Sequence, residues 1–133
     1  MKLFKRMIAG VLLLTSGLAM AATPIEDLNN VAVPTKIDGT VLTFEEVRNA
    51  IVRGCKDRGW KPELVSEGVI KASILVRNRH QAEVRIPFDS KSYSIQYVKS
   101  DNLDYDAEDH TIHRNYNKWV VYLSQSIQKE FDI

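Results

Sequence analysis

The stretch that decides the fold runs from Val69 to Tyr97 and reads VIKASILVRNRHQAEVRIPFDSKSYSIQY. Apolar and polar residues alternate along it, and polar segments interrupt the alternation at RNRH and at DSKS. Alternation with a period of two residues is typical of a strand that buries one face, and short polar interruptions are typical of hairpins. The stretch therefore predicts three antiparallel strands joined by two tight turns.

A further strand is expected just before this stretch, because the alternation extends back from Leu64 to Trp60. Paired residues must present their side chains on the same face of a sheet. Placing Leu64 opposite Ile70 leaves residues 66–68 as the connecting loop, which puts Gly68 at the left-handed position of a three-residue hairpin.

The same condition sets the other two turns. It pairs Val76 with Ala82 across residues 78–80, and it pairs Phe88 with Tyr93 across residues 89–92. All four strands then form one meander with a single apolar face.

Two amphipathic helices flank the strands. The first is predicted over Phe44 to Arg58, because Thr43 and Glu46 have the spacing of a capping box and Gly59 is a residue type that commonly closes helices. Its apolar residues recur at helical spacing; they are Phe44, Val47, Ile51 and Cys55. A second helix follows an acidic loop, and its apolar stripe consists of Ile112, Tyr116, Trp119, Val120, Leu123 and Ile127.

These elements predict an α+β fold. We expect a two-layer sandwich, in which a four-stranded antiparallel meander sheet is covered on one face by two helices, in the order α-β-β-β-β-α. The single domain spans residues 43–133. Residues 22–42 are predicted to be an extended leader segment, in which an edge strand around Val31 to Val33 is the alternative.

Residues 1–21 have the three-part pattern of a cleavable secretory signal peptide. Three basic residues, Lys2, Lys5 and Arg6, precede an apolar stretch over residues 7–18, and Ala19-Met20-Ala21 has the small outer residues that signal peptidase accepts. The apolar stretch is shorter than the roughly 20 residues that cross a bilayer, so removal is favoured over retention as an anchor. Ala22 rather than Cys follows the predicted site, so we expect an unlipidated periplasmic protein with no stable membrane insertion.

Charge and cysteine content exclude some function classes. The chain has 18 Lys and Arg against 17 Asp and Glu; the signal peptide holds three of the basic residues and none of the acidic ones, which leaves 15 against 17, a net charge of −2. Such a charge gives no global field that favours nucleic acid. The single cysteine, Cys55, allows no internal disulfide, and we expect it to be a buried apolar residue.

The acidic loop before the second helix contains the candidate metal ligands. His110 and His113 are three residues apart, so they would share one face of a helix, and Asp106 and Asp109 add carboxylates nearby. Imidazole and carboxylate together suit zinc or another transition metal. The competing interpretation is a solvated loop whose carboxylates favour the N-terminus of the second helix.

The candidate partner surface is the basic cluster Arg77, Arg79, His80 and Arg85. It would suit an anionic partner, which is either an unknown envelope protein or an anionic surface such as lipid headgroups or glycans. An ordinary solvated sheet face explains the same residues. Nucleic acid is disfavoured, because the aromatic residues fall on the core face, away from the basic ones.

Motifs of the common enzyme classes are missing from the sequence. The chain contains no Gly-x-Ser-x-Gly elbow, His-Glu-x-x-His helix, Walker loop or dinucleotide fingerprint. We therefore expect a non-enzymatic protein with no cofactor.

Three segments carry a family resemblance. They read TFEEVRNAI (43–51) with RGW (58–60), RHQAEVRI (79–86), and YSIQY (93–97) leading to IHRNYNKW (112–119). Together they resemble a family of small secreted proteins and lipoproteins of Gram-negative bacteria that has no established activity. The resemblance covers roughly residues 40–128. It implies an envelope location and the order helix, strands, helix, and it transfers no catalytic residue.

Several polar residues occupy distinctive positions at loop tips and helix starts within this pattern; they are His80, Asn102, His113, Asn115, Tyr116 and Asn117. Such residues serve either a site or the local structure, because Asn and His also bond backbone groups and hold turns together. The structural role is the favoured interpretation.

Three functions follow in order of preference. The first is a non-enzymatic periplasmic binding or accessory protein that meets a partner through the polar sheet face or the acidic loop. The second is a metal-binding periplasmic protein that uses the acidic loop with His110 and His113. The third is a hydrolase or enzyme inhibitor, which requires a pocket of convergent titratable groups from distant parts of the chain.

Overall fold

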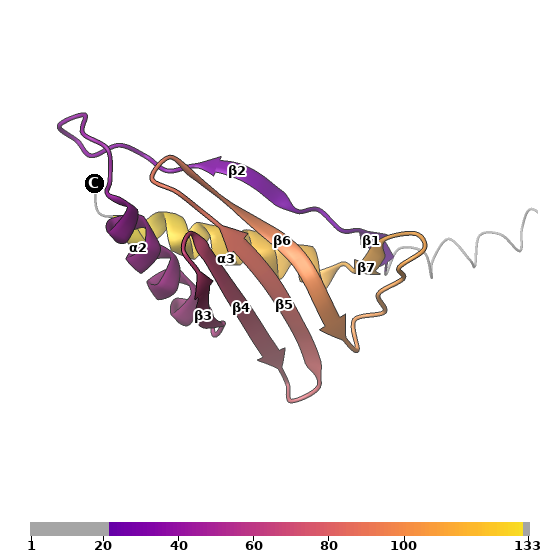
Figure 1. Ribbon diagram of the computed structural model, residues 1–133. Coiled ribbons are helices and arrows are strands. Elements are labelled where there is room, and N and C mark those ends of the chain that lie inside the picture. Colours follow the sequence, from indigo (N-terminus) through magenta and orange to yellow (C-terminus); the bar gives the residue numbers. More distant parts are fainter. Residues whose placement is uncertain (1–21, 132–133) are drawn as a thin grey trace, which may run out of the picture.

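The computed structural model describes residues 22–131 (Figure 1). The predicted signal peptide, residues 1–21, lies outside the described residues, as do residues 132–133. In chain order the helices and strands are β1 (Ala22–Pro24), β2 (Leu28–Ala32), α2 (Phe44–Asp57), β3 (Lys61–Ser66), β4 (Val69–Val76), β5 (His80–Pro87), β6 (Ser92–Asp101), β7 (Thr111–His113) and α3 (Asn115–Glu130).

The first helix, α2, begins and ends where its capping residues predict. The Thr43 hydroxyl accepts a hydrogen bond from the Glu46 backbone N–H at 3.0 Å, and the Glu46 carboxylate accepts one from the Thr43 N–H at 2.9 Å. This capping box satisfies backbone donors that the helix leaves free. At the other end, Gly59 has a φ of +81°, the left-handed conformation expected after a helix.

The main sheet has five strands, so the predicted four-stranded meander is wrong in this respect. Its order is β2-β6-β5-β4-β3, and every neighbouring pair is antiparallel. The extra strand, β2, comes from the segment predicted as a leader, for which an edge strand around Val31 to Val33 was the alternative; it spans Leu28–Ala32 and pairs Val31 with Tyr93. Its pattern was hard to read because a bulge at Asn30, with a φ of +54°, breaks the apolar alternation. Pairing with β2 covers the edge of β6 that a four-stranded meander leaves open.

The turn between β4 and β5 differs from the predicted one and moves the register by two residues. Val76 pairs with His80, which the prediction placed in the loop. Arg77 and Asn78 both have positive φ angles, +56° and +60°, and the next N–H bonds to the Val76 carbonyl oxygen at 3.2 Å. These are features of a type I′ turn, whose twist matches that of the flanking strands, so both strands extend further toward the tip. His80 thereby becomes the first residue of β5.

The pairings predicted for the other two hairpins are confirmed, although the first loop is shorter than residues 66–68, because Ser66 belongs to β3 and pairs with Val69. Leu64 pairs with Ile70, and Gly68 has a φ of +77° in the turn that follows β3. Phe88 pairs with Tyr93 between β5 and β6. The apolar alternation therefore identified the core-facing side chains of β4, β5 and β6, whereas Leu64 of β3 is 55% exposed.

A short strand precedes the second helix and was not predicted. This strand, β7, pairs with β1 in a separate two-stranded sheet, with Ala22 opposite His113. The helix α3 begins at Asn115, so Ile112 lies in β7 rather than on the helical stripe. Ile112 is fully buried, as a residue of a helical core stripe would also be. A strand of three residues is too short for alternation to reveal it.

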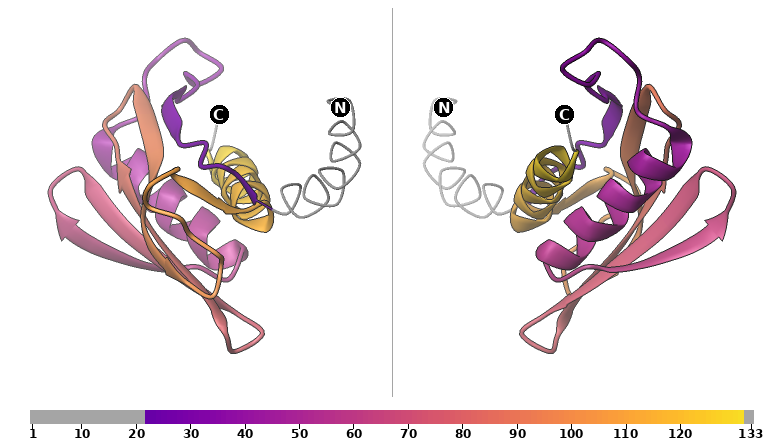
Figure 2. Two further views of the ribbon diagram at one scale, coloured as in Figure 1. Left: turned by 90° about the vertical axis from the view of Figure 1, so that its right-hand side faces the viewer. Right: turned by 90° about the vertical axis from the view of Figure 1, so that its left-hand side faces the viewer.

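Both helices lie on the same face of the five-stranded sheet (Figure 2), so the predicted α+β arrangement is confirmed at this level. Ile51 of α2, Ile86 of β5 and Leu123 of α3 are fully buried between the two layers. The hydroxyl of Tyr93 on β6 bonds to the Ser124 hydroxyl on α3 at 2.6 Å. Neither described helix is long and apolar enough to cross a bilayer.

The two helices approach each other closely at Gly54. A Cβ atom at this position would lie 2.6 Å from the Ile127 Cα on α3, so only glycine allows this contact. Cys55, the next residue, is fully buried, as predicted. Burial raises the pKa of the Cys55 thiol to about 12.

Candidate functional site

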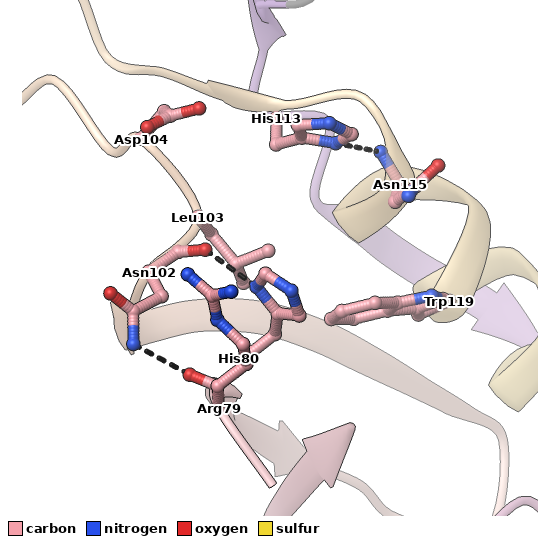
Figure 3. Close-up of a pocket in the computed structure, with 8 residues that line it drawn as sticks. All are labelled: Arg79, His80, Asn102, Leu103, Asp104, His113, Asn115 and Trp119. Atoms are coloured by element: carbon pink, nitrogen blue, oxygen red, sulfur yellow. Dashed lines mark hydrogen bonds between the residues drawn. The ribbon is translucent and has the colours of Figure 1, made fainter. Parts of the chain in front are cut away.

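Four chain segments meet around a cavity of about 280 Å³ (Figure 3). They are the turn and first residue of β5, the loop after β6, the end of β7 and the first turns of α3. The lining residues are Arg79, His80, Asn102, Leu103, Asp104, His113, Asn115 and Trp119. Because the segments are far apart in sequence, the cavity depends on the complete fold.

Asn102 joins two of these segments. Its side-chain amide donates a hydrogen bond to the Arg79 carbonyl oxygen at 2.7 Å, and its own carbonyl oxygen lies 2.8 Å from His80 Nδ1. The residue has a φ of +59°, a left-handed conformation that Asn adopts more readily than most residues. Asn102 therefore ties the loop after β6 to the start of β5.

This contact also determines the tautomer of His80. A carbonyl oxygen only accepts hydrogen bonds, so His80 Nδ1 carries a proton. In the neutral ring, Nε2 then has a free lone pair and acts as an acceptor. Figure 3 shows the imidazole of His80 between Arg79 and Trp119 at the cavity.

His113 is held in the opposite tautomer. Its backbone N–H donates to the Leu103 carbonyl oxygen at 2.8 Å, and its Nδ1 accepts a hydrogen bond from the Asn115 N–H at 3.1 Å. The proton of the neutral ring is therefore on Nε2. The cavity thus holds one imidazole that accepts and one that donates at Nε2.

The N-terminus of α3 borders the same cavity through Asn115 and Trp119. α3 lies wholly within the described residues; its N-cap, Arg114, makes no side-chain capping bond, and its first turn contains no acidic residue. Instead the His113 ring caps this end, because its Nδ1 accepts the Asn115 N–H at 3.1 Å. The start of the helix keeps its partial positive charge. Of the loop carboxylates expected to favour this helix end, Asp104 borders the same cavity as Asn115.

Arg79 and Asp104 place opposite charges at the cavity. Both side chains are exposed, and among residues 22–131 neither forms an ion pair within 4.0 Å. Leu103 is buried and Trp119 is half-buried, so they supply apolar surface beside the charges. The cavity therefore combines positive, negative and apolar groups.

The fold divides the predicted basic partner surface. Side chains alternate along β5, so His80 lies on the inner face of the sheet and Arg85 on the outer face. Arg77 and Arg79 lie in the turn, and of these two only Arg79 lines the cavity. The four residues do not form one continuous surface.

The outer face of the sheet carries both signs of charge. Lys71 pairs with Glu63 at 3.4 Å, and Glu83 stands opposite Lys99 across β5 and β6. Positive and negative side chains alternate between neighbouring strands here, so their fields largely cancel at a distance.

The predicted metal ligands are not brought together. Within residues 22–131, no three His, Cys, Asp or Glu side chains are grouped closely enough to hold a metal ion. His113 lines the cavity, whereas His110 packs edge-on against the rings of Tyr97 and Tyr105, with centroid distances of 6.5 and 6.2 Å.

The acidic loop has a structural role at Asp106. Its carboxylate accepts hydrogen bonds from the N–H groups of Glu108 at 2.9 Å and Asp109 at 3.2 Å. The backbone of Asp106 also pairs with Thr111. These bonds close the loop ahead of β7, which sets the position of His113.

Four of the polar residues singled out by their positions in the sequence do meet at the cavity; they are His80, Asn102, His113 and Asn115. Tyr116 instead is buried in the core, and Asn117 bonds to β1. Sequence reasoning missed Leu103, Asp104 and Trp119 as site residues. The sequence offered one signal for the loop, because Asn and Asp two positions apart are residues that tolerate the positive φ seen at Asn102 and Asp104.

No protein-family model, curated protein or solved structure matches this chain.

Proposed function

We propose that this chain is a non-enzymatic binding protein of the bacterial periplasm, exported through a cleaved signal peptide, and that its cavity holds a small ligand by an anionic group. The observation that carries this proposal is the meeting of Arg79, His113 and the N-terminus of α3 around one cavity. The proposed binding site is therefore this cavity, rather than the basic surface predicted from the sequence.

The donors around the cavity are those that bind anions in proteins. The Arg79 guanidinium forms charge-assisted hydrogen bonds to carboxylate or phosphate. The start of a helix adds aligned N–H groups and partial positive charge. His113 adds a neutral N–H donor, because its Nδ1 is already occupied by Asn115. Trp119 offers an apolar surface on which the remainder of a ligand packs.

The size of the cavity suits a small ligand. Its volume of about 280 Å³ lies just below the usual range for pockets of drug-sized ligands, about 300–1,000 Å³. A single small molecule or the end group of a larger one fits this space. The site is a recess rather than the broad surface that two folded proteins bury between them.

The hydrogen bonding of His113 suits a binding role. Its Nδ1 accepts the Asn115 N–H at 3.1 Å, so the neutral ring presents a donor at Nε2 in a fixed orientation.

Export is supported by the residue pattern over positions 1–21. Ala22, the residue that would follow the cleavage site, belongs to β1 and pairs with His113 at the cavity. Cleavage after Ala21 keeps β1 and every cavity residue in the mature protein. The intact mass of the protein from the periplasmic fraction is expected to match a chain that begins at Ala22. A mass that includes residues 1–21 would contradict export with cleavage.

Trp119 makes ligand binding measurable. The chain has two tryptophans, and the other, Trp60, is only 2% exposed in the core. We expect acetate or inorganic phosphate at millimolar concentration and constant ionic strength to change the Trp119 emission until it saturates. Trp119→Phe is expected to abolish this signal.

Arg79 and Arg77 provide a matched pair of variants. Both belong to the same exposed turn, and only Arg79 lines the cavity. We expect Arg79→Gln to weaken anion binding by about tenfold or more, the usual effect of losing a charged hydrogen bond, and Arg77→Gln to leave it unchanged. No saturable response in the unaltered protein, or equal weakening in both variants, would contradict the proposed function.

A further inference from the structure

The cavity contains acceptors that a simple anion would leave without partners. The Asp104 carboxylate borders the cavity, and within residues 22–131 it has no ion-pair partner at 4.0 Å or less. His80 adds the lone pair of Nε2, because its Nδ1 proton is held by the Asn102 carbonyl oxygen at 2.8 Å. An acetate or phosphate bound alone would bring negative charge toward both acceptors, which lowers affinity.

The charges of the cavity are separate and balanced. Arg79 contributes one positive charge and Asp104 one negative charge, and they lie more than 4.0 Å apart, because they form no ion pair within that limit among the described residues. Both side chains line one space of about 280 Å³, so a molecule that fills this space meets both charges. A ligand of matching charge has one cationic and one anionic group.

We infer, building on the proposed function, that the ligand is a zwitterion of the α-amino acid class. Its carboxylate meets Arg79, the N–H of His113 and the start of α3. Its ammonium group donates to the Asp104 carboxylate, with His80 Nε2 as the second acceptor. Its side chain packs against Trp119. Each polar group of the cavity then has a partner of the opposite kind.

Three ligands of nearly equal size test the contribution of each charged group to binding. L-Alanine carries both, propionate lacks the ammonium group, and L-alaninamide lacks the carboxylate. Titration calorimetry of the mature protein, with L-leucine and L-phenylalanine included to test the apolar wall, measures all five affinities under one set of conditions. We expect at least one amino acid to bind about tenfold more tightly than both propionate and L-alaninamide.

Asp104→Asn tests the ammonium subsite, and Asp101→Asn is its control. Both residues are exposed acids near the end of β6, and Asp101 does not line the cavity. We expect Asp104→Asn to remove the advantage of L-alanine over propionate while propionate itself binds equally well or better. Asp101→Asn is expected to preserve that advantage.

The outcomes distinguish this inference from the function on which it rests. If propionate binds as tightly as all three amino acids, the inference of a zwitterionic ligand is wrong, and the cavity is an anion-binding site. L-Alaninamide binding as tightly as L-alanine would overturn the inference equally, because the carboxylate would then contribute nothing. If no amino acid, propionate, acetate or phosphate binds, the proposed function itself fails.

Discussion

Asn102 contributes to the cavity through its backbone and its side chain together. Its carbonyl oxygen sets the proton of His80 on Nδ1, and its amide holds the Arg79 carbonyl oxygen at 2.7 Å. A left-handed backbone with a φ of +59° lets both contacts form at once. The orientation of His80, and with it the acceptor at Nε2, therefore depends on a residue that need not touch a ligand.

We expect Asn102→Asp to lower the free energy of unfolding by about 1–2 kcal/mol, because a carboxylate cannot donate to the Arg79 carbonyl and leaves it unpaired. Asn102→Gly keeps the left-handed backbone without strain and loses only the amide, so its loss is expected to be about 1 kcal/mol or less. Urea denaturation of the two variants measures both values. An Asp variant as stable as the unaltered protein would show that this hydrogen bond contributes nothing.

Cys55 gives a prediction about alkaline pH. Burial raises the pKa of its thiol from 9.0 to about 12, so the unfolded chain ionises first. The contribution of the buried thiol to stability is therefore complete below pH 9 and is lost as the pH rises toward 12. We expect stability to fall less steeply over this interval in Cys55→Ala, although that variant is less stable at neutral pH. Parallel pH profiles of the two proteins would contradict this effect.

At the scale of elements, the contact between α2 and α3 is limited by one residue. Gly54 allows the helices to approach so closely that a Cβ would lie 2.6 Å from the Ile127 Cα. Backbone atoms cannot yield as a side chain can, so any larger residue must push the helices apart. The close approach keeps α3 against α2.

We expect Gly54→Ala to destabilise the protein by about 1–3 kcal/mol through overpacking, even though Ala favours a helix by about 1 kcal/mol over Gly. Lys56→Ala, at an exposed position of the same helix, is the control and is expected to change stability by less than about 0.5 kcal/mol. Thermal or urea unfolding measures both. A stabilised Gly54→Ala protein would mean that helix propensity outweighs the contact.

The turn between β4 and β5 predicts a stabilising change. Arg77 and Asn78 hold positive φ angles in a type I′ turn, where Asn followed by Gly is preferred. We expect the double variant Arg77→Asn, Asn78→Gly to raise the free energy of unfolding by about 1 kcal/mol, because the strain of a long side chain at positive φ is relieved. Loss of stability would indicate the longer loop over residues 78–80 in place of this turn.

The sequence predicted those elements whose signals are local. The capping box at Thr43 and Glu46 and the alternation across the central strands identified α2 and four strands correctly. β1 and β7 escaped, and β2 was only an alternative around Val31 to Val33, because these strands are short or bulged and their pairing partners lie far along the chain. Such strands exist only because an edge of existing structure is available to them, which a local pattern does not record.

At the scale of the whole molecule, the cavity was only partly predictable. His80 and His113 stood out by position, yet a two-residue change of register in one hairpin decides whether His80 is a loop residue or faces inward. Trp119 was assigned to the core stripe, because helical spacing does not reveal that the stripe ends at a cavity. Asp104 is one of several acids in its loop, and the fold alone selects it.

The cavity also joins parts of the molecule that stabilise one another. β1 pairs with β7 at Ala22 and His113, and Asn117 of α3 donates hydrogen bonds to Thr23 and Pro24 at 3.1 and 2.9 Å. The start of the proposed mature chain thus supports the wall that carries His113. A site supported in this way is held in place before a ligand arrives, which reduces the entropy cost of binding.

The most direct test of the binding cavity is a nitrogen-15 NMR spectrum of the imidazole rings recorded while acetate or L-alanine is added. The chain has three histidines, of which His80 and His113 line the cavity and His110 lies outside it. We predict that the free protein shows the Nδ1–H tautomer for His80 and the Nε2–H tautomer for His113, and that both signals shift to saturation while His110 stays constant. Three unchanged histidines, or a His110 signal that moves as far as the other two, would contradict a specific ligand site in this cavity.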